Sequence, residues 1–185
     1  LADRMGMNRI RDELEDLSFS VLNKPARDLI LNRLKFIKNN REDTFKIISA
    51  ELIKLLNENG INAKIAGREK TPFSIWRKIQ NKKISLEQLT DIIGFRILVD
   101  SIEDCYKTLG IFHSRFSAIP GKFKDYISTP KINKYKSIHT SLIGPMKQRI
   151  EVQIRTHEMH EFAERGIASH WKYKSSEKFS DLSWH

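Results

Sequence analysis

Cysteine is nearly absent from this sequence, since Cys105 is the only one among 185 residues. A disulfide within the chain is therefore excluded, and a zinc site built on cysteines is strongly disfavoured. A chain that uses no disulfide suits a reducing compartment, so we expect a cytoplasmic location. Long apolar runs are lacking as well. No stretch approaches the ~18 apolar residues of a membrane-spanning helix, and we expect no membrane partner.

Several short motifs are also missing. No G-x-x-x-x-G-K-[ST] sequence occurs, which excludes a P-loop. His157 and His160 are three residues apart and do not form H-E-x-x-H, so we favour capping and surface roles for them over a zinc site. The chain opens with Leu1, without an initiator Met or an apolar signal segment, and we interpret it as a piece of a longer protein.

Positive charge, by contrast, is abundant. The chain has 33 Lys and Arg against 23 Asp and Glu, a formal net charge of +10. Such an excess predicts an anionic partner, which is a nucleic acid, a nucleotide or an acidic membrane surface. The total charge does not choose among these partners, so the choice depends on where the charges lie.

Residues 1–58 have the apolar periodicity of helices. Pro25 interrupts the pattern, and a second periodic run follows it. The polar residues 38–41 either divide this second run or form an exposed face. Asn59-Gly60 is a helix stop signal. We therefore expect an N-terminal helical extension that ends before residue 59.

Strands and helices alternate along the rest of the chain. Apolar alternation predicts the strands, and cap residues such as Thr71, Ser101 and Thr156 predict the starts of the helices. A basic loop, residues 117–136, separates the last two strands from the elements before it. The pattern predicts an α/β (α+β) fold with a mixed sheet flanked by helices. Expected strands cover residues 61–65, 92–99, 137–143 and 149–155, and expected helices begin at residues 72, 102 and 157, the last two ending near residues 116 and 171.

A first candidate site follows the strand that ends near Gly67. Lys70 comes just before a helix, and Ser74 and Lys78 lie four residues apart on one face of that helix. Free N–H groups and the positive end of the helix dipole favour phosphate at such a place. The alternative is a solvated basic helix face.

Two acidic residues accompany strands. Asp91 precedes a buried strand that contains Arg96, and a carboxylate at a strand edge can hold Mg²⁺. Strand alternation would put Asp91 and Arg96 on opposite faces, unless the strand starts after Asp91 or bulges. Glu151, Gln153 and Arg155 alternate with apolar residues and share one face, which suits a metal-bound polyphosphate. The alternatives are a turn aspartate and a solvent-facing sheet surface.

An aromatic residue lies among cations just before another strand. Tyr135 ends the segment that contains Lys131 and Asn133, and two residues later Ser137 begins a strand on which His139 shares its face. Such a ring can stack on a nucleotide base. The alternative is a tyrosine buried against the sheet.

Six motifs thus follow one another along the chain: Gly67-Arg68-x-Lys70-x-x-x-Ser74-Ile75-x-x-Lys78, Asp91-x-x-Gly94-x-Arg96, Phe123-Lys124-Asp125-Tyr126-Ile127, Lys131-x-Asn133-x-Tyr135-x-Ser137-x-His139-Thr140, Glu151-Val152-Gln153-Ile154-Arg155-Thr156 and Glu158-Met159-His160. Their order and spacing resemble the synthetase domain of the RelA/SpoT family, and the resemblance extends from about residue 1 to residue 173.

The resemblance implies a nucleotidyltransferase-like fold and an activity. The 3′-hydroxyl of GDP or GTP would attack the β-phosphorus of ATP and release AMP, giving the alarmone (p)ppGpp of the stringent response. It implies Mg²⁺ at Asp91 and Glu151, with Glu151 accepting the hydroxyl proton. The other implied roles are Arg68 and Arg96 around adenine, Lys70, Ser74 and Lys78 at the ATP phosphates, Tyr135 stacked on guanine, Lys122, Lys124, Lys131, Asn133 and His139 at the GDP or GTP site, and Gln153 and Arg155 in support of Glu151.

The resemblance also divides the chain. Residues 1–58 resemble the junction to a hydrolase domain, residues 59–174 the synthetase domain, and residues 175–185 form a weakly ordered tail. No His-Asp pair of the hydrolase type is present, so we expect no hydrolase activity. The hydrolase and regulatory domains of the long family members lie outside the chain, as would any ribosome association made through them.

One motif bears on the choice of nucleotide. Lys122-Phe123-Lys124-Asp125 resembles the basic Arg-x-Lys-Asp version of bifunctional members, with lysine in place of arginine, which keeps the charge but loses the bidentate fork. Two other functions stay open from the residues alone. One is a basic module that binds RNA or the ribosome and has a dead nucleotide site. The other is a different nucleotidyltransferase on the same fold.

Overall fold

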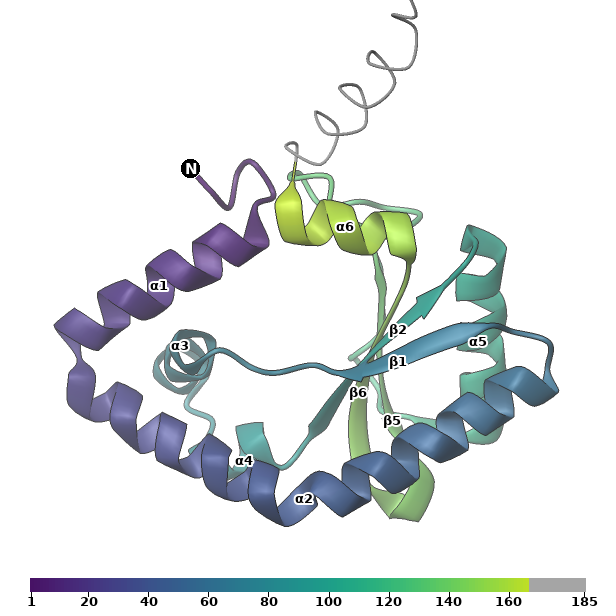
Figure 1. The fold of residues 1–185 in the computed structure, drawn as a ribbon, viewed down its shortest axis with the longest axis horizontal. Coiled ribbons are helices and arrows are strands. Elements are labelled where there is room, and N and C mark those ends of the chain that lie inside the picture. Colours follow the sequence, from purple (N-terminus) through teal and green to yellow (C-terminus); the bar gives the residue numbers. More distant parts are fainter. Residues whose placement is uncertain (167–185) are drawn as a thin grey trace, which may run out of the picture.

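Two helices open the chain in a computed structural model that describes residues 1–166 (Figure 1). They are α1 (Asn8–Leu22) and α2 (Lys24–Glu58). Asn23 caps α2, since its side chain accepts a hydrogen bond from the amide of Ala26 at 3.3 Å, and Pro25 occupies the first turn, where no amide hydrogen is needed. The polar residues 38–41 do not divide α2, which runs unbroken for 35 residues.

The described residues contain six strands in one sheet, whose mixed character confirms the prediction. They are β1 (Ala63–Gly67), β2 (Ile93–Val99), β3 (Ser117–Ala118), β4 (Lys124–Asp125), β5 (Ile138–Ile143) and β6 (Arg149–Thr156). The order is β1-β2-β6-β5-β3, and β4 also pairs with β5. Among the strands of residues 1–166, only β2 and β6 run parallel, and every other pairing is antiparallel. The basic loop therefore contains two short strands that the sequence did not predict.

Within residues 1–166, four further α-helices lie around the sheet: α3 (Pro72–Lys82), α4 (Leu86–Thr90), α5 (Ile102–Arg115) and α6 (His157–Arg165). A short 3-10 helix, η1 (Pro145–Lys147), joins β5 to β6. The three expected caps are confirmed, because Thr71, Ser101 and Thr156 each accept a hydrogen bond from the amide three residues later. Helix α4 was not predicted, although Ser85 begins it with a capping box. The part of the last expected helix that reaches residue 171 lies outside the described residues, as does the expected tail.

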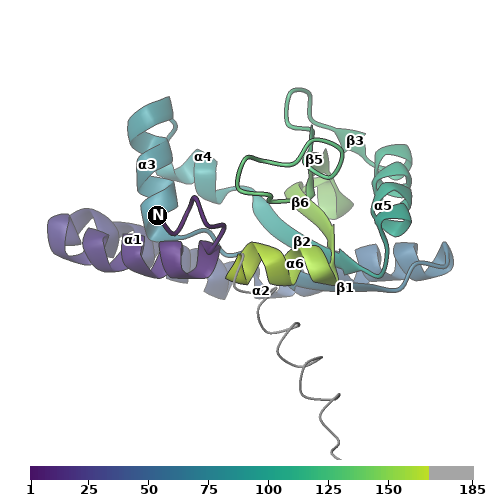
Figure 2. The same ribbon diagram turned by 90° about the horizontal axis from the view of Figure 1, so that it is seen from above.

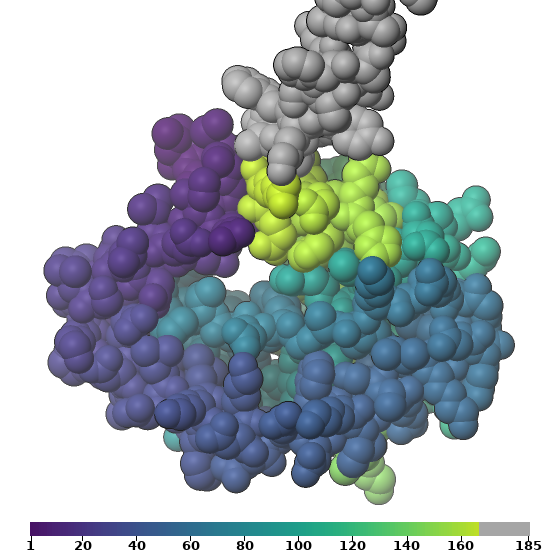
Figure 3. All heavy atoms as spheres, in the orientation of Figure 1, coloured from purple at the N-terminus to yellow at the C-terminus, as the bar shows by residue number. Residues whose placement is uncertain are grey.

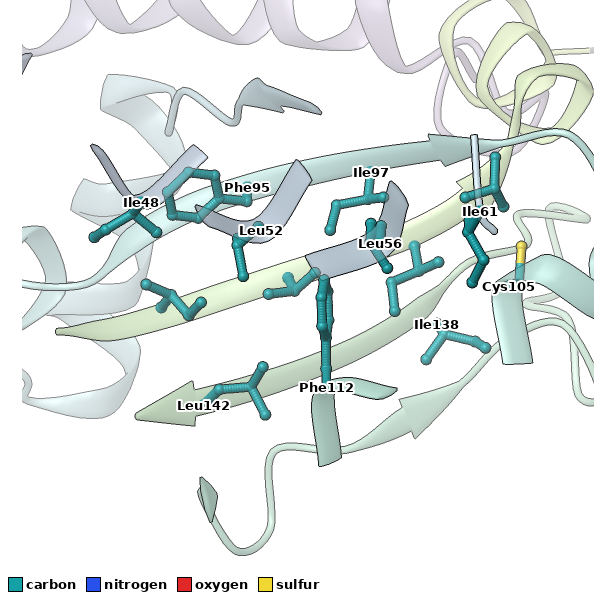
Figure 4. Packing of buried hydrophobic residues seen from close by; sticks show 14 residues of the cluster. Ile48, Leu52, Leu56, Ile61, Phe95, Ile97, Cys105, Phe112, Ile138 and Leu142 are labelled. Atoms are coloured by element: carbon teal, nitrogen blue, oxygen red, sulfur yellow. The ribbon is translucent and has the colours of Figure 1, made fainter. Parts of the chain in front are cut away.

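The main core lies on one face of the sheet. Figure 4 shows Ile48, Leu52 and Leu56 of α2 next to side chains of the strands, with Phe112 of α5 in the same cluster. All four side chains are completely buried. Seen from above in Figure 2, α5 and the pair α3–α4 lie on opposite sides of the strands. The face of the sheet opposite the core, the open face, carries polar side chains such as Arg96, Glu151 and Gln153.

A smaller apolar cluster fastens the helical extension to the rest. Phe19 of α1, Ile30 of α2 and Ile75 of α3 are buried together. At the other end of α1, the first residues lie beside α6 in the space-filling view (Figure 3). There a Cβ on Gly166 would be 2.2 Å from the carbonyl oxygen of Met5, so only glycine fits. No helix within residues 1–166 has both the length and the apolar character that crossing a membrane requires.

Candidate active site

The register of the sheet brings predicted site residues into one row on the face opposite the core. Arg96 of β2 pairs with Gln153 of β6, Gln153 pairs with His139 of β5, and His139 pairs with Lys124 of β4. Residues directly opposite each other in neighbouring strands point to the same face. Segments far apart in the sequence thus place two cations, an amide and an imidazole side by side.

Glu151 lies in the neighbouring row, where it pairs with Gly94. Nη1 of Arg68 is 3.4 Å from Oε2 of Glu151. The backbone amide of Arg68 donates a hydrogen bond to the carbonyl of Gly94 at 2.9 Å. A Cβ at Gly94 would approach the carbonyl oxygen of Arg68 to 3.0 Å. The missing side chain at Gly94 therefore lets the Arg68 segment close over the strand next to Glu151.

The charge of this carboxylate also acts on two lysines. Burial lowers the pKa values of Lys70 and Lys78, and Glu151 is the charge that opposes this effect on both. Lys70 already has oxygen partners, because its ammonium group donates to the carbonyl of Leu89 at 2.6 Å and to that of Ile92 at 3.2 Å. Lys70 thus ties the start of α3 to the corner between α4 and β2.

Ser74 is less directly available than the sequence analysis expected. Its hydroxyl donates to the carbonyl of Thr71 at 2.8 Å, within the first turn of α3. The amide of Ser74 is also engaged, since it donates to the side chain of Thr71 at 3.2 Å. Ser74 reaches an anion at this helix start only after its hydroxyl leaves the carbonyl.

Asp91 lies at the corner before β2. It ends α4 in a helical conformation, and the strand begins two residues later at Ile93, so the conflict between Asp91 and Arg96 over strand faces does not arise. Its carboxylate accepts a hydrogen bond from Arg41 of α2 at 2.8 Å, and its carbonyl accepts one from Gln148 at 3.0 Å. Arg41 was not among the predicted residues, and nothing in its local sequence pattern indicates this long-range contact.

The acidic residues can be compared with the needs of a divalent cation. Residues 1–166 contain no cluster of three or more His, Cys, Asp or Glu side chains that would hold a metal by themselves. Mg²⁺ is commonly held by one or two carboxylates together with water and substrate phosphates. Asp91 and Glu151 suit that second arrangement, in which the nucleotide completes the coordination. Each of these carboxylates is paired with an arginine, which would have to move away before the carboxylate could bind a metal ion.

Three rings and a cation meet at the other end of the row. The Tyr135 hydroxyl is 2.8 Å from Nε2 of His139, and Tyr126 contacts both rings edge-on. Nζ of Lys131 is 4.8 Å from the centre of the Tyr126 ring and 4.9 Å from that of Tyr135. Tyr126 was not among the predicted site residues, although its position directly after the Lys-Phe-Lys-Asp motif was a signal for it.

Burial sets the charge state of this cluster. It lowers the pKa of His139 to about 3, with Arg68, Lys131 and Arg155 adding to the effect, so the ring is neutral at pH 7. Burial also lowers the pKa of Arg155, to about 10, which leaves the guanidinium charged. Arg155 is 2% exposed, and its guanidinium carbon is 5.8 Å from the centre of the Tyr135 ring. The guanidinium of Arg155 thus lies over Tyr135.

The remaining predicted residues lie at the edges of the site. The side-chain amide of Asn133 donates to the carbonyl of Asp3 at 3.3 Å, and its oxygen accepts from the amide of Tyr135 at 3.2 Å, so Asn133 shapes the basic loop. Arg96 is 3.8 Å from Glu164 of α6. Lys122 is exposed on the basic loop.

A mixed sheet that carries an acid, an amide and several cations on its open face is typical of an α/β domain that handles polyphosphates. Comparison with known families makes the assignment specific. The model described as "Region found in RelA / SpoT proteins" matches residues 67–178, more than half of the chain. The protein belongs to the RelA/SpoT family.

Relatives and solved structures agree with this assignment. A GTP pyrophosphokinase of Brucella melitensis is 49% identical over 174 residues, 94% of this chain and 23% of the relative, and one of Myxococcus xanthus is 45% identical over 179 residues, again 94% and 23%. The chain thus spans about a quarter of the length of these relatives. The structure of small alarmone synthetase 1 from Bacillus subtilis bound to its product pppGpp has 26% identity and a TM-score of 0.53, covering 76% of this chain and 81% of that one.

Proposed function

We propose that this chain is a (p)ppGpp synthetase unit that transfers a pyrophosphate group from ATP to the 3′-hydroxyl of GDP or GTP. The observation that carries the proposal is the contact of Arg68 with Glu151 at 3.4 Å on the open face of the sheet, where the charge of Glu151 also acts on Lys70 and Lys78. Cations around one acid suit a site that binds polyphosphates and removes a proton. The names of the family's relatives and of the solved structure support the same reaction.

In the proposed reaction the 3′-oxygen of the acceptor forms a bond to the β-phosphorus of ATP. The bond from that phosphorus to the α–β bridging oxygen breaks, AMP leaves, and Glu151 takes the hydroxyl proton. Arg68, Lys70 and Lys78 bind the ATP side, where Arg96 completes the adenine site. Mg²⁺, when held by Asp91 and Glu151, supplies neutralising charge for the phosphates.

The acceptor lies on the basic-loop side of the same face. Tyr135 stacks on guanine, and Lys131, Asn133 and His139 surround it, with Lys122 and Lys124 nearby. His139 is neutral there and therefore acts as a hydrogen-bonding group and not as a cation. Gln153 occupies the middle of the row between the two substrates. The helical extension before residue 59 connects this unit to the other domains of a longer cytoplasmic protein.

A synthesis assay tests the proposal. The chain is incubated with ATP, GDP and Mg²⁺, and we expect ppGpp and AMP in equal amounts by chromatography. Glu151→Gln keeps the shape of the side chain but removes its charge, and should lower turnover by about 100-fold or more while both nucleotides still bind. Glu161→Gln changes an exposed acid of α6 that pairs with Arg165, and serves as the matched control.

The outcomes are distinct. Full turnover of Glu151→Gln would exclude Glu151 as both proton acceptor and metal ligand. A wild-type chain that binds both nucleotides and makes no product would contradict the proposed activity.

A further inference from the structure

The motif Lys122-Phe123-Lys124-Asp125 divides its side chains between two faces of the sheet. Lys124 pairs with His139, which lies on the open face, whereas Asp125 pairs with Ile138, which is buried in the core face. Directly paired residues share a face, and neighbours along a strand alternate. Lys124 thus belongs to the site side and Asp125 to the side covered by α5, where Phe123 also contacts His113. Lys122 lies before the strand, and its charge acts on Lys78 on the site side.

Two side chains of α5 hold these two residues. The Tyr106 hydroxyl donates to Oδ2 of Asp125 at 2.9 Å. The His113 ring meets the Phe123 ring edge-on, with centroids 6.0 Å apart, and its Nε2 is 2.8 Å from the hydroxyl of Thr140 in β5. Tyr106 and His113 are seven residues apart, which is two helical turns, so both project from the same side of α5.

Asp125 also forms hydrogen bonds within the basic loop. Its Oδ1 accepts hydrogen bonds from the amides of Ile127 at 2.9 Å and Ser128 at 3.0 Å. Burial by itself would raise the pKa of Asp125, but the hydrogen bonds from Ser128, Tyr106 and Ile127 outweigh it and lower the pKa. The carboxylate is therefore charged at neutral pH and holds a tight turn around Tyr126.

Tyr126 connects that turn to the site. Its amide donates to the carbonyl of Ser137 at 2.9 Å, and its ring contacts Tyr135 and His139. A shift of Asp125 would therefore displace the neighbouring ring that packs against Tyr135. Two side-chain contacts thus connect α5 to this cluster. Tyr106 bonds to Asp125, and Tyr126, the residue after Asp125, contacts the rings of Tyr135 and His139.

We infer that Tyr106 is a positioning residue for the guanine nucleotide, acting through Asp125, with His113 and Phe123 as its companion anchor. The inference rests on the proposed function, since it takes the basic loop to carry the acceptor. Tyr106 itself lies on the far side of the sheet from the site and touches no substrate. Its hydroxyl fixes which way the two lysines of the motif point.

Tyr106→Phe tests the inference because it removes one hydroxyl from a side chain that is 38% exposed. We expect the KM for GDP to rise about threefold to tenfold, the loss typical of one ordinary hydrogen bond at a partly exposed position, with kcat and the KM for ATP within about twofold of wild type. The amides of Ile127 and Ser128 should exchange hydrogen for deuterium faster. Ser114→Ala, which removes a hydroxyl that bonds only within α5, is the matched control and should change neither measurement.

A double variant separates the proposed path from a general loosening of α5. If Tyr106 acts through Asp125, Tyr106→Phe combined with Asp125→Ala should bind GDP no worse than Asp125→Ala alone. Additive losses would overturn the inference, as would equal rises in the KM for both nucleotides. Unchanged amide exchange in Tyr106→Phe would also overturn it, even if the wild-type chain made no ppGpp, so this measurement is independent of the proposed activity.

Discussion

Tyr135 illustrates how burial changes the interpretation of a single residue. The sequence left open whether its ring stacks on a base or packs against the sheet. In the structure the residue is 9% exposed, its hydroxyl is bonded to His139, and Lys131 and Arg155 both lie over the ring. A ring held in this way is fixed in orientation before any nucleotide arrives, and truncation to alanine would mix the loss of stacking with the loss of packing.

Tyr135→Leu is therefore a better test of the stacking role, because it keeps most of the apolar volume but removes the aromatic face. We expect GDP affinity to fall about 5- to 150-fold, the equivalent of ~1–3 kcal/mol for one stacked base, while affinity for an ATP analogue stays the same. Calorimetric titrations with each nucleotide measure both. Tyr135→Phe keeps the ring and should retain most of the GDP affinity, so an equal loss in the two variants would contradict stacking.

At the scale of elements, the N-cap residue Thr71 holds the first turn of α3, which forms part of the proposed ATP site. Thr71 accepts from the amide of Ser74, and α3 also carries Lys78. We expect Thr71→Ala to lower the free energy of unfolding by about 0.5–2 kcal/mol and to raise the KM for ATP severalfold, because the first turn would fray where phosphates bind. Thermal melting and steady-state kinetics provide the two measurements.

The neighbouring helix offers a control for that prediction. Ser85 caps α4 in the same way, with Gln88 completing a capping box. Ser85→Ala should cost similar stability and leave the KM for ATP near the wild-type value, whereas Thr71→Ser should restore it. A rise in the KM for ATP with Ser85→Ala as large as with Thr71→Ala would mean that general destabilisation, and not the α3 cap, is responsible.

At the scale of the whole molecule, the chain represents about a quarter of its long relatives, one of which is named as a pyrophosphohydrolase. We expect this chain to release no pyrophosphate from ppGpp, even with Mn²⁺, because none of its six histidines is followed by aspartate. Manganese-dependent breakdown of ppGpp by a preparation that also passes the synthesis assay would contradict this.

The sequence by itself determined the local structure and the family. Helix starts at Thr71, Ser101 and Thr156 were predictable because a cap is a hydrogen bond between residues three apart. The strands of the mixed sheet were predictable because alternation of apolar residues reports which side chains face the core. The shared face of Glu151 and Gln153 followed from the same rule. The elements that were not predicted are short ones, such as α4 and the strands in the basic loop, because they have too few residues for a periodic signal.

Only the tertiary structure decided which of these faces meet. The row from Arg96 to Lys124 depends on strand register, which is set by hydrogen bonds between segments that lie up to tens of residues apart. The ion pair of Arg41 with Asp91 and the bond of Tyr106 with Asp125 depend in the same way on how α2 and α5 pack against the sheet. Burial likewise depends on how the whole molecule packs. The residues next to His139 in the sequence therefore did not indicate that its pKa is lowered.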